Sequence, residues 1–170
     1  MTVLTLTGLA LVASGLPGEA THALDVHWVH GQTPKIVYLL DRSEGRIPVH
    51  QAAENWNRTP NFQFIVVADC PVAADCVEVR ERPLQRNYLG LTTLDTAGDH
   101  ITAAKVALNA NREMTPGTRL AVTCHELGHV AGLNHRGGVQ SCLGSGARDR
   151  RMQPDQHDFS ELEKIYAHTH

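Results

Sequence analysis

Aromatic side chains are scarce in this sequence. The 170 residues include two tryptophans, three tyrosines and three phenylalanines, against eleven histidines. So few aromatic residues do not favour a ligand pocket lined by aromatic rings. So many imidazoles favour metal chemistry, and the spacing of the histidines is therefore the first pattern of interest.

The sequence also lacks an excess of positive charge and a long apolar segment. Its net charge is -3, and its 15 basic residues are scattered along the chain, so nucleic acid is not an expected partner. The apolar run over residues 3–16 is too short to cross a bilayer as a helix, so stable membrane insertion is not expected. A chain of this length suits one domain with a single core, and we expect a monomer.

Residues 1–23 have the layout of an export signal without its usual positively charged start. The apolar run leads to small residues at Ala20 and Ala23, and cleavage fits after either alanine. We therefore expect a secretion signal over residues 1–23, a single domain over residues 24–170, and a secreted, extracellular protein. The alternative is a first strand packed on the domain.

Four cysteines support export, because an even number at close spacing is common where thiols are oxidised. Cys70 and Cys76 flank a short loop opened by Pro71 and are predicted to pair, which leaves Cys124 and Cys142 to pair with each other. The alternative is four reduced, buried thiols.

Apolar spacing predicts an α+β fold. Strands are expected over residues 35–41, 62–68, 76–81 and 101–109, the last of them near a sheet edge because its alternation is weak. Helices are expected over residues 47–57 and 118–133, the second with Thr115 and Pro116 as start signals. An irregular segment over 136–153 precedes a closing helix that is expected to start at Ser160, with Glu163 at capping-box spacing. Asp158 is expected to cap that helix rather than to support the site from below.

The stretch "HELGHVAGLNH", residues 125–135, carries the chemistry. On a helix, His125 and His129 project from one face one turn apart, so both can reach one metal ion. Gly132 can adopt the left-handed conformation that ends the helix and returns His135 towards the same point. Three neutral nitrogens with one open position are typical of a catalytic zinc site.

Three imidazoles add no negative charge, so zinc keeps its full charge and lowers the pKa of a bound water towards about 7. Glu126 is placed to take the proton of that water and pass it to a leaving amine. The pattern therefore predicts hydrolysis of a peptide bond. A helix that merely packs needs neither the glycine nor the third histidine.

The same residues resemble the metzincin zinc peptidases, whose signature H-E-x-x-H-x-x-G-x-x-H is matched in full. Within them the chain looks most like the matrixins, over roughly residues 33–168. The resemblance implies a metzincin-like catalytic domain: a twisted mixed sheet with an edge strand, two long helices, and a small C-terminal subdomain with one helix. It also implies one zinc ion held by the three histidines, Glu126 as the general base, and an extended peptide bound antiparallel to the edge strand. Whether calcium binds is left open.

Three features depart from the matrixin pattern. Leu143 stands where matrixins have the methionine of a tight turn below the zinc, an apolar exchange of similar volume that usually costs under about 1.5 kcal/mol. No Pro-x-Tyr follows it, and no inhibitory propeptide cysteine is present. Leu143 is expected to fill the hydrophobic floor of the site.

The sequence therefore predicts a secreted zinc endopeptidase that cleaves internal peptide bonds by means of a zinc-bound water, with the peptide paired to the strand at 101–109. The alternatives are a catalytically silent zinc-binding module derived from a metallopeptidase and a zinc exopeptidase or amidohydrolase. Surface or capping roles are expected for the other histidines, at positions 22, 27, 30, 50, 100, 157, 168 and 170.

Overall fold

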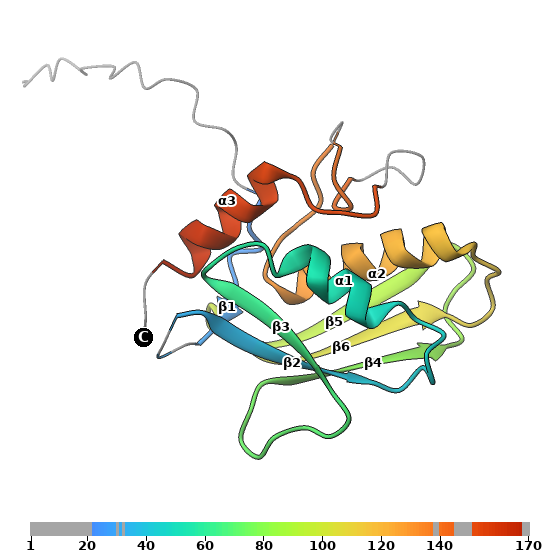
Figure 1. Ribbon diagram of the computed structural model, residues 1–170, viewed down its shortest axis with the longest axis horizontal. Helices are drawn as coiled ribbons and strands as arrows, with labels where there is room; N and C mark the ends of the chain where they lie inside the picture. Colours follow the sequence, from blue (N-terminus) through green and yellow to red (C-terminus); the bar gives the residue numbers. More distant parts are fainter. Residues whose placement is uncertain (1–21, 30, 32, 138–139, 145–150, 168–170) are drawn as a thin grey trace, which may run out of the picture.

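The computed structural model of the protein describes residues 22–29, 31, 33–137, 140–144 and 151–167. Most of the expected export signal, residues 1–21, lies outside this part. The elements follow in the order β1 (His27–Trp28), β2 (Lys35–Asp41), α1 (Val49–Trp56), β3 (Phe62–Val67), β4 (Cys76–Arg82), β5 (Gly90–Ala97), β6 (His100–Asn109), α2 (Pro116–Val130) and α3 (Gln156–Ile165). In the described residues these elements form a mixed sheet and three helices, arranged as Figure 1 shows.

The sheet is parallel except at β5. Strands β3, β2, β4 and β6 are neighbours in that order, and β1 pairs with the first residues of β6, which extend past the start of β4. The remaining side of β6 pairs with β5, which is antiparallel to it. Within the described part of the chain β5 has no second strand partner, so β5 borders the sheet on this side.

This topology corrects the predicted edge strand, because β6 is internal and β5 is at the edge. The last four residues of β6 are all buried, so its weak alternation reflects burial on both faces, as in an internal strand of a parallel sheet. The sequence of β5, "GLTTLDTA", has no apolar alternation and was not predicted as a strand.

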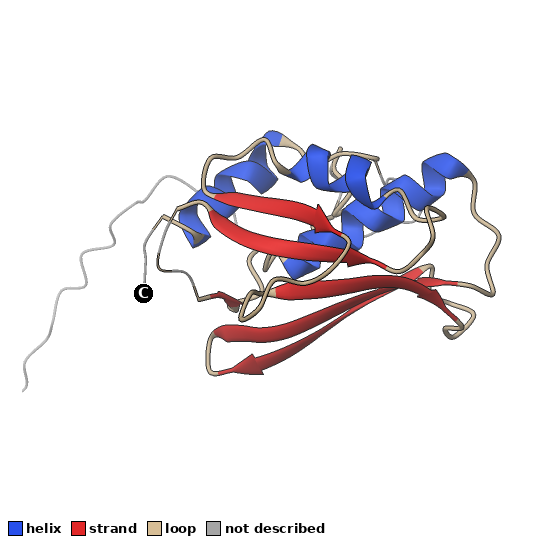
Figure 2. Ribbon diagram, turned by 60° about the horizontal axis from the view of Figure 1, so that its bottom comes forward, coloured by secondary structure: helices blue, strands red, loops and turns tan. Residues whose placement is uncertain are grey.

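Helices α1 and α2 pack beside each other on one face of the sheet (Figures 1 and 2). The α1 residues Val49, Ala52, Ala53 and Trp56 are buried at helical spacing. Among the helices of the described residues, α2 has 15 residues, α3 has 10 and α1 has 8, so the expectation of two long helices is not met there. The chain leaves α1 at Asn57, whose side-chain amide exchanges two hydrogen bonds with the backbone of Phe64 in β3.

The closing helix α3 begins earlier than its sequence indicates. Asp155 is the N-cap, and it forms a capping box with Asp158. Ser160 lies inside the helix and donates its hydroxyl proton to the Gln156 carbonyl, so the predicted start at Ser160 is wrong. The capping role expected for Asp158 is present. At the other end, buried Tyr166 donates to the Ala131 carbonyl just after α2 (3.1 Å).

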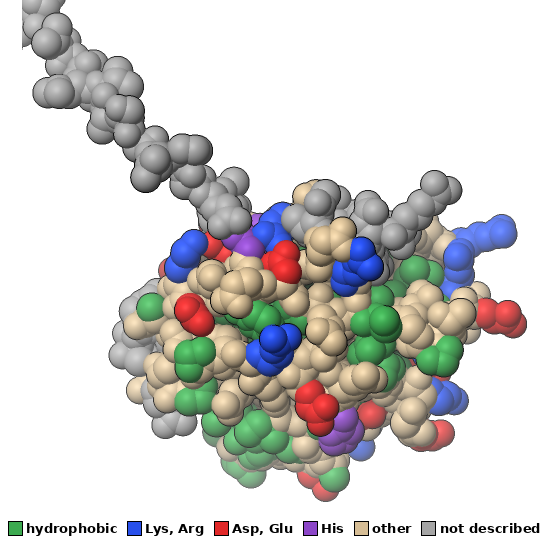
Figure 3. Space-filling model, turned by 45° about the horizontal axis from the view of Figure 1, so that its top comes forward, with side chains coloured by type: hydrophobic (Ala, Val, Ile, Leu, Met, Phe, Trp, Pro, Cys, Tyr) green, Lys and Arg blue, Asp and Glu red, His purple; other side chains and the backbone are tan. Residues whose placement is uncertain are grey.

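One hydrophobic core joins the sheet, α1, α2 and α3. Two disulfides support it with the pairing that the sequence predicts: Cys70–Cys76 closes the loop between β3 and β4, and Cys124–Cys142 ties α2 to the irregular segment. On the face drawn in Figure 3, charges of both signs are interspersed. No helix in the described residues is long and apolar enough to cross a membrane.

Candidate metal centre

The three histidines of the motif converge at the C-terminal half of α2. The Nε2 atom of His125 lies 2.9 Å from that of His135 and 3.2 Å from that of His129, and the last two are 3.1 Å apart. Nitrogens bound to one tetrahedral zinc ion at roughly 2.0–2.1 Å lie about 3.4 Å apart. The spacing of the three nitrogens therefore suits a metal ion of this size.

Backbone carbonyls select the tautomer of two of these rings. His125 Nδ1 lies 2.7 Å from the Cys142 oxygen, and His129 Nδ1 lies 2.8 Å from the Leu133 oxygen. A carbonyl oxygen only accepts, so each Nδ1 carries the proton and each neutral ring presents the Nε2 lone pair to the cluster. Lone pairs this close repel each other unless a cation lies between them, so the donor set fits zinc.

The turn after α2 places the third histidine. Gly132 has a φ of 91°, and a Cβ atom there would lie 2.7 Å from the Val26 oxygen, so glycine is required both by conformation and by space. The N-terminal segment binds the same turn: Leu24 N–H donates to the Gly132 oxygen (2.8 Å), and Asn134 N–H donates to the His22 oxygen (2.6 Å). The turn that returns His135 is therefore held from outside the motif.

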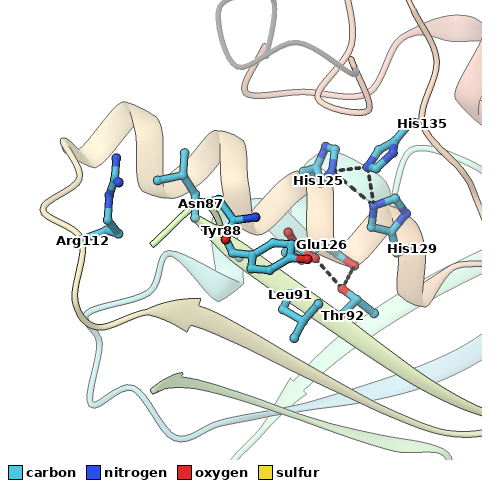
Figure 4. A pocket seen from close by; sticks show the side chains of 11 residues that line it. Asn87, Tyr88, Leu91, Thr92, Arg112, His125, Glu126, His129 and His135 are labelled. Carbon is cyan, nitrogen blue, oxygen red and sulfur yellow. Dashed lines mark hydrogen bonds between the residues drawn. The ribbon is translucent and has the colours of Figure 1, made fainter. Parts of the chain in front are cut away.

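Glu126 lies beside the cluster and is 4% exposed. The Thr92 hydroxyl of β5 is 2.8 Å from Glu126 Oε2 and 2.9 Å from its backbone oxygen (Figure 4). Gly90 of the same strand approaches so closely that a Cβ atom there would lie 2.6 Å from Glu126 Oε1. The carboxylate is thus bordered by two residues of the edge strand.

Leu143 is fully buried beneath the motif. A Cβ atom on Gly128 would lie 2.6 Å from Leu143 Cδ2 and 2.8 Å from Trp56 Cζ2, so Leu143 packs against the helix backbone between His125 and His129. Its N–H donates to Ser141 Oγ (3.0 Å). Leu143 therefore packs directly under the part of α2 that carries His125 and His129; its role as the floor of the site stays a prediction.

Asp158 supports this turn as well as capping α3. Its carboxylate accepts from Ser141 Oγ and from the Asp155 N–H, and His22 Nε2 lies 3.1 Å from it. Burial by itself raises the pKa of Asp158, but the bonds from His22, Ser141 and Asp155 and the charge of Arg136 outweigh burial and hold the pKa below its ordinary value.

A pocket of about 460 Å³ opens in front of the three histidines and Glu126. Its other wall comes from residues 87–92, which include the first three residues of β5, and Arg112 lines the pocket on the side away from the histidines (Figure 4). Arg112 donates to the Arg86 carbonyl (2.9 Å). The pocket is therefore an elongated cleft between α2 and the edge strand.

The structure brings together every residue that the motif singles out, with Leu143 below them and Cys124–Cys142 adjoining. Among the described residues, His125, His129 and His135 form the group of histidine, cysteine and acidic side chains that could hold a metal ion. Sequence reasoning missed Thr92, Gly90 and Ser141. It also assigned His22 to the surface or a cap, whereas His22 is buried and stacks on His157 with centroids 4.9 Å apart. No local spacing relates these residues to the motif.

No protein-family model and no curated protein matches this sequence. Among solved structures, the chain is similar to archaemetzincin from Archaeoglobus fulgidus, which was crystallised in complex with malonate. The TM-score is 0.45 and the identity 15%, over 74% of this chain and 99% of that one. A likeness at this level assigns no family, and it does not single out the matrixins.

Proposed function

We propose that this protein is a zinc-dependent endopeptidase. One observation carries the proposal: three Nε2 atoms lie within 3.2 Å of one another beside the buried carboxylate of Glu126, in a cleft that runs along a strand edge. His125, His129 and His135 are the proposed ligands of one zinc ion.

The proposed chemistry divides between the metal and Glu126. Zinc bound at the three nitrogens supplies Lewis acidity towards a carbonyl oxygen and a water molecule. Glu126 takes the proton of the attacking water and delivers it to the amine that leaves when the C–N bond breaks. Low exposure suits this step, because a carboxylate shielded from bulk water holds a fixed orientation towards the substrate.

The proposed peptide site is the open edge of β5, not β6 as the sequence suggested. Asn109 N–H donates to the Leu89 oxygen (2.9 Å), so these two residues form a hydrogen-bonded pair in the antiparallel ladder. Such pairs alternate along the strand, and Gly90, Thr92 and Leu94 therefore direct their N–H and C=O groups away from β6. An extended peptide antiparallel to β5 can bind those groups with its scissile carbonyl near the histidines.

We also propose that the protein is exported. The two disulfides support this, because such bonds persist in oxidising compartments. The apolar start of the sequence leading to Ala20 and Ala23 agrees with it.

Digestion of a peptide library by the zinc-loaded protein tests the proposed function. Cleavage at internal bonds supports the endopeptidase. Removal of terminal residues alone would replace it by an exopeptidase, and zinc binding without any cleavage would replace it by a silent zinc module.

Two variants connect the result to the site. Glu126→Ala should keep one zinc per chain and retain only a small residual rate of hydrolysis, because only the proton carrier is removed. His129→Ala should lose the zinc itself, because two ligands are too few for a stable site. Full zinc retention in His129→Ala would mean that the ligand set is wrong.

A further inference from the structure

The edge strand contacts the carboxylate of Glu126 at two alternate positions. Side chains alternate between the two faces of a strand, so Gly90 and Thr92 lie on one face of β5, the face towards α2. Thr93, between Thr92 and Leu94, is exposed. The strand thus presents a hydroxyl and an empty position to the same carboxylate.

The hydroxyl of Thr92 has one proton and two oxygens of Glu126 within reach, Oε2 at 2.8 Å and the backbone oxygen at 2.9 Å. A charged carboxylate is the stronger acceptor of the two. The bond to Oε2 fixes the rotation of the carboxylate about its last torsion, which is otherwise broad, and sets which oxygen turns towards the cleft.

Gly90 matters because its missing side chain leaves room for Glu126, and not because of its backbone conformation. A Cβ atom at this position would lie 2.6 Å from Glu126 Oε1, 2.8 Å from Glu126 Cγ and 2.7 Å from Val122 Cγ1. All three atoms belong to side chains, so an alanine here displaces the carboxylate more readily than it disrupts the fold. The position of Glu126 therefore depends on the absence of a side chain at residue 90.

We propose that Thr92 and Gly90 are positioning residues for Glu126, and that β5 thereby sets the general base in register with the peptide that pairs with the same strand. The inference rests on the proposed function, because it gives Glu126 the role of the base. In this proposal the backbone of Thr92 binds the peptide, and its hydroxyl binds the carboxylate of Glu126. A single residue therefore determines the distance between the scissile bond and that carboxylate.

Thr92→Val tests the hydroxyl, since it keeps the branched shape and removes the donor. We expect kcat to fall about 10- to 100-fold, the range typical of residues that orient an active-site group, with KM within about twofold and one zinc per chain retained. Thr92→Ser restores the hydroxyl and should recover kcat to within a few-fold. Thr93→Val makes the same chemical change on the exposed face of the strand and should leave both constants unchanged.

Gly90→Ala tests the empty position. It should lower kcat at least as much as Thr92→Val, while zinc content and the thermal unfolding midpoint stay close to those of the wild type. In a Glu126→Ala background neither substitution should reduce the residual rate further, because each acts only through Glu126. A further loss there, or a fall in kcat no larger than that of Thr93→Val, would overturn the proposal.

A measurement on metal-free protein separates this proposal from the proposed function. Thr92→Val and Glu126→Ala remove the two ends of one contact, so their shifts in unfolding midpoint should not add in the double variant. Additive shifts would show that Thr92 does not hold Glu126. If the wild-type protein cleaves no peptide, the endopeptidase proposal fails, and the midpoints alone decide whether Thr92 positions the carboxylate.

Discussion

Two glycines leave room for the side chains of Leu143, Trp56 and Glu126 around the three histidines. Gly128 stands at a variable position of the signature, yet Leu143 and Trp56 fill the space above its Cα atom. Gly90 leaves the corresponding space to Glu126. Neither glycine has a positive φ, so at these residues glycine serves close packing rather than backbone freedom.

Leu143 gives a prediction at this scale. Leu143→Met should keep kcat/KM within a few-fold, because the exchange conserves volume against Gly128. Leu143→Asp should abolish activity, because it buries a charge without a partner beneath the histidines. Peptide hydrolysis and zinc content of the two variants measure this, and equal activity in both would remove Leu143 from the floor of the site.

The role of each element depends on its neighbours. Strand β5 has a polar, weakly patterned sequence, but its place beside β6 leaves one edge without a strand partner in the described residues, next to the three histidines. Helix α3 is short, but its first turn contributes the carboxylate that holds Ser141 below the site.

If a peptide pairs with β5, its backbone hydrogen bonds to the strand should involve every second peptide residue. In the inactive Glu126→Ala protein, N-methylation of successive peptide amides should weaken binding at alternate positions only, by about three- to tenfold for each lost hydrogen bond. Peptide affinities measured by titration calorimetry test this. A uniform effect, or none, would place the peptide away from the edge of β5.

Asp158 at the start of α3 predicts a pH dependence of stability. Its pKa is lower in the folded protein than in the unfolded chain, so its contribution to the unfolding free energy is complete above the unfolded value of about 3.9. That contribution is lost as the pH falls through the folded pKa. In metal-free protein, Asp158→Asn should therefore be less stable than wild type near neutral pH and should lose less stability on acidification below about pH 4.

Glu54→Gln is the matched control, because it removes an exposed carboxylate from α1. Denaturant unfolding at several pH values gives the comparison. If Asp158→Asn and Glu54→Gln have the same acid dependence as the wild type, the network around Asp158 does not stabilise the charged form.

At the scale of the whole molecule, His22 and Ala23, which precede β1, contact residues on both sides of the candidate site. His22 contacts Asp158 and His157, its carbonyl accepts from Asn134 next to the third histidine, and Ala23 bridges to Leu133. Residues that precede β1 thus join the turn after α2 to the first residues of α3.

This arrangement predicts that a chain starting at Thr21 is more stable than one starting at Leu24. The shorter chain leaves the buried carboxylate of Asp158 without its His22 partner, at a cost of about 1–3 kcal/mol in unfolding free energy. Thermal or denaturant unfolding of the two chains measures the difference. If the protein is exported, cleavage after Ala20 is expected, and N-terminal sequencing of the secreted protein checks it; equal stability of the two chains would contradict the structural role of residues 22 and 23.

Patterns within a few residues were sufficient to predict helix α2, its stop at Gly132, and the common face of His125 and His129. They were also sufficient to predict the strands β2, β3 and β4 and the disulfide pairing. Each of these depends on interactions between residues close in sequence, or on elimination among four cysteines. The helical period alone brings two imidazoles onto one face.

Only the tertiary structure decided which strand is at the edge, where α3 begins, and what surrounds Glu126, Leu143 and Asp158. Thr92 and Glu126 are 34 residues apart, and no sequence period connects a strand side chain to a helix side chain across that separation. The order of the strands depends on how the helices cover the apolar face of the sheet. That packing is a property of the assembled core and not of any single segment. The sequence therefore determined the spacing of the three histidines, whereas packing between distant segments determined what holds Glu126 and Leu143 beside them.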